Sequence, residues 1–331
     1  MQLTPKTAQE ISTLQAGDLI QESQNILIIT HYRPDGDAIG SSLALASSLQ
    51  ALGKSVCCLD RDETPDYLKF LERGYNHMHP SIPVGAESPD LIIALDCATI
   101  ERLGHELVQS LPQVQCLVID HHITNERYGD YLILDSQAAA TGEILYGLLK
   151  DNDFPIPDQA RDALYVAIST DTGSLQYSSS SVHTYQTMTD LVGLGADVAA
   201  LNAQTYFNHS PRRLFILREC LQRFQIEHEG QVSFWAIPYA IQKEIGIQAG
   251  DTEGLMDLLR GVQGVRVCFT LEESASGTVR LSVRSKDEGV DVSQVCAHFG
   301  GGGHRMAAGA ALEMPLEKCI KQVLEVVGES L

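Results

Sequence analysis

Aspartate and histidine residues directly follow three short apolar segments of the chain, and these residue types suit metal binding and acid–base chemistry. They are His31, Asp35 and Asp37 after NILIIT, Asp96 after LIIAL, and Asp120, His121 and His122 after CLVI. A further acidic residue, Asp171, ends the helical pattern ALYVAISTD and is a candidate for the same place. In open α/β sheets ligands bind beyond the carboxyl ends of the strands, so we expect these groups to converge in one crevice.

Four carboxylates in one crevice repel one another unless they are protonated or neutralised by cations. Two divalent cations would balance that charge, and mixed aspartate and histidine donors suit Mn²⁺, Fe²⁺ or Co²⁺ better than Mg²⁺. Two ions about 3.5–4 Å apart form a site that hydrolyses phosphate esters, with a metal-bound hydroxide as the nucleophile. Asp96 is the natural candidate to bridge both ions, because it is central in the pattern.

Each element of this pattern also has a purely structural interpretation. A PDGD segment on its own more often forms a turn that caps a helix. Asp35 and Asp37 do not continue into the ligand spacing of an EF-hand, which disfavours calcium. The triplet Asp120-His121-His122 after an apolar strand lacks a packing rationale. The elements together therefore favour a functional site.

The segments that must position these residues predict an α/β fold. Unbroken apolar runs of strand length indicate a sheet that is covered on both faces. They lie at Asn25–Thr30, Ser55–Leu59, Leu91–Leu95 and Cys116–Ile119. Helical patterns between and after them fit parallel crossover connections. They include the segment with Ile39, Leu43, Ala46, Leu49 and Leu52, and the segments Gly142–Lys150 and Asp158–Ile168. We predict a mostly parallel sheet flanked by helices in a larger domain, residues 1–197.

The pattern of predicted secondary structure changes near residue 200. Residues 198–218 are predicted to form a helical connector, with Pro211 placed to begin a new helix. Residues 219–331 are predicted to form a smaller α+β domain, with a cleft between the two domains. Its strand patterns are Gln231–Ile237, Val265–Leu271 and Thr278–Arg284, followed by a helix at Val292–Phe299, four glycines and a helix from Leu316.

Composition limits the partners and the compartment. The chain has 331 residues, with 23 Lys and Arg against 43 Asp and Glu, for a formal net charge of −20. Such a surface repels long nucleic acids, although bound cations can still hold a small anionic substrate. Eight cysteines without a CxxC pair, and the lack of a signal peptide or an apolar membrane span, indicate a cytoplasmic protein with reduced thiols and no membrane partner.

The motifs HYRPDGDAIGS, ALDCA, VIDHH and STDTGS resemble those of the DHH phosphoesterases, the RecJ-like family. The later segment FGGGGHRMAAGA resembles the signature of the DHH-associated C-terminal domain. The resemblance spans about residues 25 to 315. The compact two-domain layout looks most like the NrnA-type enzymes of this family, which are Mn²⁺-dependent oligoribonucleases that also dephosphorylate 3′-phosphoadenosine 5′-phosphate (pAp).

The resemblance implies a role for each residue of the pattern. One metal ion would be held by His31, Asp35 and Asp96. The other would be held by Asp37, Asp96, His121 and Asp171. Asp120 would orient a histidine, and His122 would lie beside the substrate phosphate as a hydrogen-bond donor or general acid. Both cofactor ions are expected to be Mn²⁺.

The second domain is expected to supply positive charge and donors for a phosphate. Arg284, Ser285 and His304 match or adjoin positions where the family contacts substrate, and Gly301, Gly302 and Gly303 would let backbone N–H groups approach a phosphate. The sequence departs from the family after the TDTG motif. Family members often carry an arginine there, whereas this chain has Gln176.

These observations predict a two-metal hydrolase that cleaves short RNA to mononucleotides and pAp to AMP. A phosphodiesterase for cyclic dinucleotides such as c-di-AMP, or for linear pApA, needs the same metals and nearly the same pocket. A non-catalytic nucleotide sensor is the alternative of a different class. Long nucleic acid is not an expected partner, and a homodimer is possible, since the family often forms one.

Overall fold

The computed structural model describes residues 8–72, 78–79, 88–248, 250–252 and 254–331. The chain divides into two compact units, Met1–Asn208 and His209–Leu331, with the division between helices α7 (Val198–Tyr206) and α8 (Pro211–Gln222). Pro211 is the first residue of α8, where its missing N–H costs no hydrogen bond. Each unit has its own sheet and its own hydrophobic core.

The first unit contains a seven-stranded sheet in which every pair of neighbouring strands is parallel. Its strands, in spatial order, are β1 (Gln9–Glu10), β7 (Tyr131–Leu134), β6 (Gln115–Asp120), β5 (Leu91–Leu95), β2 (Asn25–Ile29), β3 (Ser55–Leu59) and β4 (Met78–His79). The central strands are apolar without interruption because both of their faces are buried. Ile26 and Ile28 of β2 belong to one core cluster, whereas Leu27 and Ile29 belong to another.

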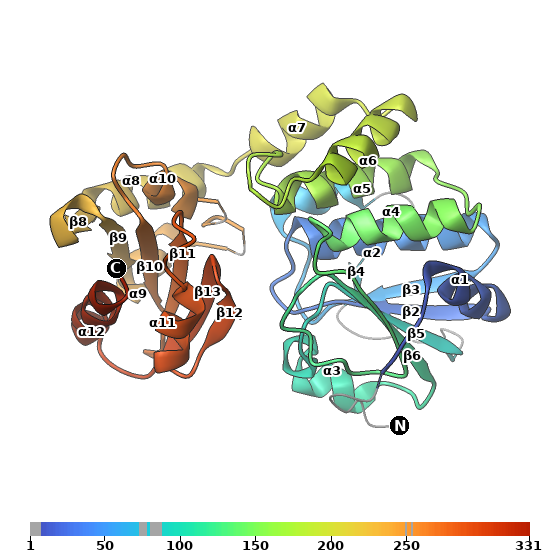
Figure 1. Ribbon diagram of the computed structural model, residues 1–331, viewed down its shortest axis with the longest axis horizontal. Helices are drawn as coiled ribbons and strands as arrows, with labels where there is room; N and C mark the ends of the chain where they lie inside the picture. The colour runs from blue at the N-terminus through green and yellow to red at the C-terminus, as the bar shows by residue number, and fades with distance from the viewer. Residues whose placement is uncertain (1–7, 73–77, 80–87, 249, 253) are drawn as a thin grey trace. The chain divides into compact units, whose positions relative to one another are not determined.

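Helices cover both faces of this sheet, with α2, α4 and α5 on one side and α3 on the other (Figure 1). The helices of this unit are α1 (Thr13–Glu22), α2 (Gly36–Ala51), α3 (His105–Ser110), α4 (Thr141–Asp151), α5 (Asp158–Asp171), α6 (Val182–Gly193) and α7. The short 3₁₀ segments are η1 (Asp66–Leu71) and η2 (Ile100–Leu103). A close approach of α2 to α5 requires Gly40, since a Cβ there would lie 2.6 Å from the carbonyl oxygen of Ala163.

The second unit is built on a six-stranded sheet in which only β9 and β10 pair in parallel. Its strands, in spatial order, are β12 (Gly302–His304), β13 (Ala307–Leu312), β11 (Val279–Ser285), β10 (Val267–Glu273), β9 (Val232–Ile237) and β8 (Gln225–Glu227). Its helices are α8, α9 (Tyr239–Ile245), α10 (Met256–Arg260), α11 (Val292–His298) and α12 (Leu316–Glu329), with a 3₁₀ turn, η3, at His228–Gly230. Residues of α11 and α12 pack on one face of the sheet, and residues of α8 and α10 pack on the other.

This architecture confirms the predicted fold class, a larger domain with a parallel sheet and a smaller α+β domain. The prediction missed the helices α1, α3, α6, α9 and α10 and the short strands β1, β4, β7 and β8. It also missed the strands β12 and β13. Their glycine- and alanine-rich sequences carry little β propensity. The helix predicted at Asp158–Ile168 continues to Asp171, which therefore occupies the last position of α5. Among the described residues, no helix is both long enough and apolar enough to span a membrane.

Candidate metal centre

The loop from β2 to α2 positions three of the predicted site residues. Asp35 is the N-cap of α2, and its Oδ1 accepts hydrogen bonds from the N–H groups of Asp37 and Ala38, both at 3.1 Å. Its other oxygen, Oδ2, lies 3.9 Å from Nε2 of His31. The PDGD segment is therefore compatible with both interpretations, because the carboxylate of Asp35 caps α2 with one oxygen and faces His31 with the other.

Asp37 is buried, and backbone and hydroxyl donors fix both of its oxygens. Oδ2 accepts from the N–H of Thr141 at 2.6 Å, and Oδ1 accepts from the N–H of Gly142 and the hydroxyl of Ser41, both at 2.9 Å. The two N–H groups belong to the first turn of α4, where a helix favours a negative charge. Burial and the nearby charges, that of Asp96 foremost, nevertheless raise the pKa of Asp37 well above its usual value.

Asp96 follows β5 and is the residue that faces the most histidines. Its φ of 53° lies in the left-handed region, an uncommon conformation for a residue with a side chain. Its Oδ2 is 3.5 Å from Nε2 of His31, and its Oδ1 is 3.6 Å from both Nε2 of His121 and Nδ1 of His122. Burial acts to raise the pKa of this carboxyl, but the contact with His31 and the other two histidines hold that pKa below its ordinary value.

His31 and His121 present the same ring nitrogen to the carboxylates. Nδ1 of His31 lies 3.0 Å from the carbonyl oxygen of Tyr32, and Nδ1 of His121 lies 3.3 Å from that of Ala138. A carbonyl accepts only, so a proton on each Nδ1 suits these contacts and leaves the lone pair on Nε2, although Nδ1 of His31 also lies 2.9 Å from a donor, Nη2 of Arg102. Nε2 of His121 is 3.5 Å from Oδ2 of Asp171 and 4.0 Å from Oδ2 of Asp37. This tautomer is the one that a metal-binding histidine needs.

Asp120, the last residue of β6, lies beneath His122 and is fully buried. Its Oδ1 accepts from Nδ1 of His122 at 2.7 Å and from the N–H of His121 at 2.9 Å, while Oδ2 accepts from the amide of Asn125 at 2.6 Å. Burial opposes the charged form of His122, but Asp120, with Asp96, raises the pKa of His122 to about 9. Asp120 therefore fixes both the orientation and the proton of this imidazole.

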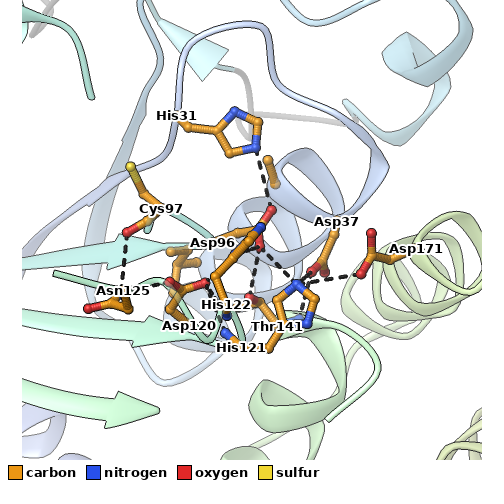
Figure 2. A network of polar contacts seen from close by, with 12 residues as sticks. His31, Asp37, Asp96, Cys97, Asp120, His121, His122, Asn125, Thr141 and Asp171 are labelled. Atoms are coloured by element: carbon orange, nitrogen blue, oxygen red, sulfur yellow. Dashed lines mark hydrogen bonds and ion pairs between the residues drawn. The ribbon is translucent and has the colours of Figure 1, made fainter. Parts of the chain in front are cut away.

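Asp171 completes the cluster from the C-terminal end of α5 (Figure 2). Its burial and the negative charges of Asp35 and Asp96 raise its pKa to about 7, while His121 acts in the opposite direction. In the part of the chain that the structure describes, three sets of donor atoms lie within 4.8 Å of one another. They are His31, Asp35 and Asp96; Asp37, His121 and Asp171; and Asp96, His121 and His122. The structure thus brings all six predicted metal ligands together in one cluster.

The cluster suits cations on its own geometry. Several carboxylates and the Nε2 atoms of His31 and His121 meet in a largely buried place. Such a set is electrostatically unfavourable without positive charge between its members. The mixture of oxygen and imidazole nitrogen donors fits divalent transition-metal cations.

The predicted substrate-binding residues lie in the second unit, along three neighbouring strands. Arg284 of β11 and His304 of β12 both pair with Ala307 of β13, from opposite sides. Directly paired residues point to the same face of a sheet, so these side chains stand on one face, separated by a single strand. The strand pairing therefore places Arg284 and His304, two possible hydrogen-bond donors for an anion, at the same register position of this sheet.

The glycines and Ser285 have structural partners of their own. A Cβ on Gly301 would lie 2.2 Å from the carbonyl oxygen of Gly309, and one on Gly303 would lie 2.6 Å from that of Ala307, whereas Gly302 faces open space. Two glycines are thus required for the approach of this segment to β13. Ser285 donates its hydroxyl to the carbonyl of Asp287 at 2.8 Å.

Two contributors to the cluster were not predicted. Thr141 donates its backbone N–H to Asp37 and its hydroxyl to Asp96 Oδ1 at 3.1 Å, so one residue fixes two carboxylates. Arg102 places Nη2 2.9 Å from Nδ1 of His31. Neither residue belongs to the aspartate and histidine motifs, and only the tertiary structure places them at the site.

The site and fold define a class of protein. The DHH family model, N-terminal domain, matches residues 25–168, and the DHHA1 domain model matches residues 236–331. The chain belongs to the DHH family of phosphoesterases and carries its associated DHHA1 domain, as the motifs predicted.

Individual proteins are similar to this chain over nearly its full length. The chain is 30% identical to the bifunctional oligoribonuclease and PAP phosphatase NrnA of Thermus thermophilus, over 92% of this chain and 90% of the relative. In fold it is similar to an exopolyphosphatase-related protein from Bacteroides fragilis, with a TM-score of 0.85 and 23% identity over 96% of this chain and 95% of the other. It is also similar in fold to exonuclease RecJ solved with manganese, with a TM-score of 0.51 and 17% identity over 99% of this chain and 95% of the other.

Proposed function

We propose that this chain is a two-metal phosphoesterase that hydrolyses short oligoribonucleotides to mononucleotides and pAp to AMP. The observation that carries the proposal is the cluster of four carboxylates and two correctly oriented imidazoles at the carboxyl ends of the parallel strands. The likeness over nearly full length to an enzyme named for both activities supports the choice of substrates.

The metal ions are proposed to be two Mn²⁺. His31, Asp35 and Asp96 would hold one ion, and Asp37, Asp96, His121 and Asp171 would hold the other. Ions of this kind, when bound, activate water and neutralise charge on a phosphate ester. Imidazole and carboxylate donors together favour Mn²⁺ over Mg²⁺, which prefers oxygen donors alone.

The side chains around the ions have separate tasks. Asp120 is a positioning residue, since its bond to Nδ1 holds His122 with Nε2 as the remaining ring nitrogen. His122 is proposed as the catalytic residue that donates a hydrogen bond, or a proton, to the phosphate or the leaving oxygen. Thr141 fixes the orientations of Asp37 and Asp96.

The second unit is proposed to bind the nucleotide. Arg284 and His304 stand on one sheet face and would donate to a phosphate, with N–H groups of Gly301, Gly302 and Gly303 beside them. Short substrates suit a chain with a net charge of −20, because only a few phosphates have to be held against a repulsive surface.

The test is hydrolysis by the purified full chain with Mn²⁺ of pApA, pAp and c-di-AMP, each compared with the Asp96→Ala variant. We expect AMP from pApA and from pAp, and no product from the variant. Faster opening of c-di-AMP than of pApA would replace the proposal with a cyclic dinucleotide phosphodiesterase. Binding of nucleotides and Mn²⁺ without hydrolysis of any of the three would show a sensor.

A further inference from the structure

Positive charge gathers at the metal cluster within the first unit itself. Three arginines of this unit, Arg33, Arg61 and Arg102, form no ion pair with any carboxylate in the described ranges of the chain. Arg127 and Arg161 of the same unit each pair with a neighbouring carboxylate. In a chain with a net charge of −20, cations without a counterion need an explanation.

These arginines come from three loops at the same edge of the sheet. Arg33 lies in the loop after β2, Arg61 lies two residues after the end of β3, and Arg102 lies in η2 after β5. The strands β5, β2 and β3 are neighbours, so their carboxyl ends meet beside the metal cluster.

Contacts tie two of these arginines to one tyrosine. The N–H of Tyr32 donates to the carbonyl oxygen of Arg102 at 2.8 Å. The guanidinium carbon of Arg61 lies 5.5 Å from the centre of the Tyr32 ring, a cation–π contact. The stem of Arg61 also passes close to Gly104, where an added Cβ would lie 3.3 Å from Cδ of Arg61. Arg61, Arg102 and Tyr32 thus form one surface, which we call the arginine subsite.

Two acidic residues lie near this surface, and neither forms an ion pair with its guanidinium groups. Asp62 accepts from the N–H of Arg33 at 2.7 Å, and one oxygen of the buried Asp60 accepts from the N–H of Asp62 at 2.6 Å. Neither carboxylate lies within ion-pair distance of the guanidinium of Arg61 or Arg102. Arg102 acts to lower the pKa of Asp60, but burial raises that pKa to about 7, so this carboxyl offsets the positive charge of the subsite only in part.

One contact joins this surface to the metal cluster. Nη2 of Arg102 lies 2.9 Å from Nδ1 of His31, whose Nε2 lies 3.5 Å from Oδ2 of Asp96. In the part of the chain that the structure describes, this is the one side-chain hydrogen bond of Arg102, although its guanidinium carries five N–H donors. Most of these donors are therefore available to a ligand.

We infer that the arginine subsite binds a second phosphate group of the substrate, distinct from the phosphate that is cleaved. Phosphate oxygens would accept from these N–H donors, and guanidinium groups bind phosphate with paired donors. An anion there lies one imidazole ring away from the carboxylate cluster, close enough to belong to the same substrate molecule. The inference rests on the function proposed above and extends it, because it predicts a preference for substrates with two phosphates.

Arg61 gives the sharper test, since Arg102 contacts a predicted metal ligand. We compare Arg61→Gln with the parent on pAp, which has two phosphates, and on bis(p-nitrophenyl) phosphate, which has one. Loss of a charge-assisted contact is expected to raise KM for pAp about tenfold, with kcat changed less than about threefold. Neither constant should change for the one-phosphate substrate. Arg61→Lys, which keeps the charge, should recover part of the lost affinity.

Two controls separate this role from a structural one. Arg127→Gln removes an arginine that is paired with Glu10, and it should leave KM for pAp unchanged. Calorimetric titration with Mn²⁺ should give the parent affinity for Arg61→Gln. An active parent enzyme whose KM for pAp is unaltered by Arg61→Gln would refute the subsite alone. A parent that cleaves no phosphate ester would refute the proposed function, and the inference with it.

Discussion

Removal of the Thr141 hydroxyl tests how tightly the carboxylates are held. Thr141 is fully buried and donates its hydroxyl to Oδ1 of Asp96 at 3.1 Å, while its backbone N–H bonds to Asp37 at 2.6 Å. Thr141→Val has nearly the same shape and keeps the backbone contact, so it removes one hydrogen bond from the residue that is central to the cluster.

A hydrogen bond to a charged group contributes about 1.5–3 kcal/mol. In free solution Asp96 would find water, but at this buried position the valine offers no donor. We therefore expect Mn²⁺ affinity to fall by roughly 10- to 100-fold, the range typical for groups that orient metal ligands. Calorimetric titration with Mn²⁺ measures the affinity, and hydrolysis of pAp at saturating Mn²⁺ measures what remains of kcat.

Two variants make the comparison specific. Thr141→Ser keeps a hydroxyl and should bind Mn²⁺ within about threefold of the parent. Thr205→Val removes a buried hydroxyl that donates to Leu201 within α7, away from the cluster, and it should not change the affinity. Parent-like Mn²⁺ affinity and kcat in Thr141→Val would refute the argument that this hydroxyl positions Asp96.

Three further predictions concern the proton donor, the charge of the cluster and the glycine segment. The side chain in Asp120→Asn cannot accept from all the donors that surround Asp120, so His122 loses its fixed orientation. We expect kcat to fall about 10²-fold while Mn²⁺ affinity stays within about threefold of the parent. Equal losses in kcat and in Mn²⁺ affinity would contradict separate roles for Asp120 and the metal ligands. In EDTA the melting temperature should fall as pH rises from 5 to 8. The pKa values of Asp37 and Asp171 are raised in the folded state, so between pH 5 and 8 the folded state binds more protons than the unfolded state. The free energy of unfolding therefore decreases as these protons leave. The pKa of His122, raised to about 9, acts in the same direction. Asp171→Asn should reduce this slope, and a melting temperature that rises with pH would be inconsistent with the assignment. Gly301→Ala places a Cβ 2.2 Å from the carbonyl of Gly309 and should destabilise the second unit by about 1–3 kcal/mol, whereas Gly302→Ala, in open space, should have little effect. The buried Trp235, the only tryptophan in the chain, reports unfolding of this unit by fluorescence in urea, and equal effects of the two alanines would contradict the steric argument.

The sequence was sufficient to predict the central sheet because its strands are buried on both faces. Leu91–Leu95 and Ser55–Leu59 are strands with the predicted bounds, since an unbroken apolar run ends where the chain leaves the core. The acidic and histidine residues after these runs could be predicted to converge for the same reason, as strand direction fixes which ends meet.

The remaining parts depend on tertiary contacts without a local pattern. β13 is formed from AAGAAL, whose low intrinsic β propensity is overcome by pairing with strands on both sides. His183 showed no acidic partner in its surrounding sequence, yet its Nδ1 lies 2.5 Å from the buried Glu143 of α4. Thr141 and Arg102 were missed likewise, because a threonine and an arginine gain a role here only from their neighbours in space.

The bonds from the N-terminal turn of α4 to Asp37 join residues 104 and 105 positions apart in the chain. The carboxylate cluster therefore exists only after the sheet, α2 and α4 have assembled. The repulsion between its like charges opposes folding at that late stage. Ions that bind only the finished cluster stabilise the native state without assisting the earlier steps. Mn²⁺ should consequently slow the unfolding of the first unit and leave its refolding rate nearly unchanged. The metal would then stabilise the native state kinetically, although the chain folds without it.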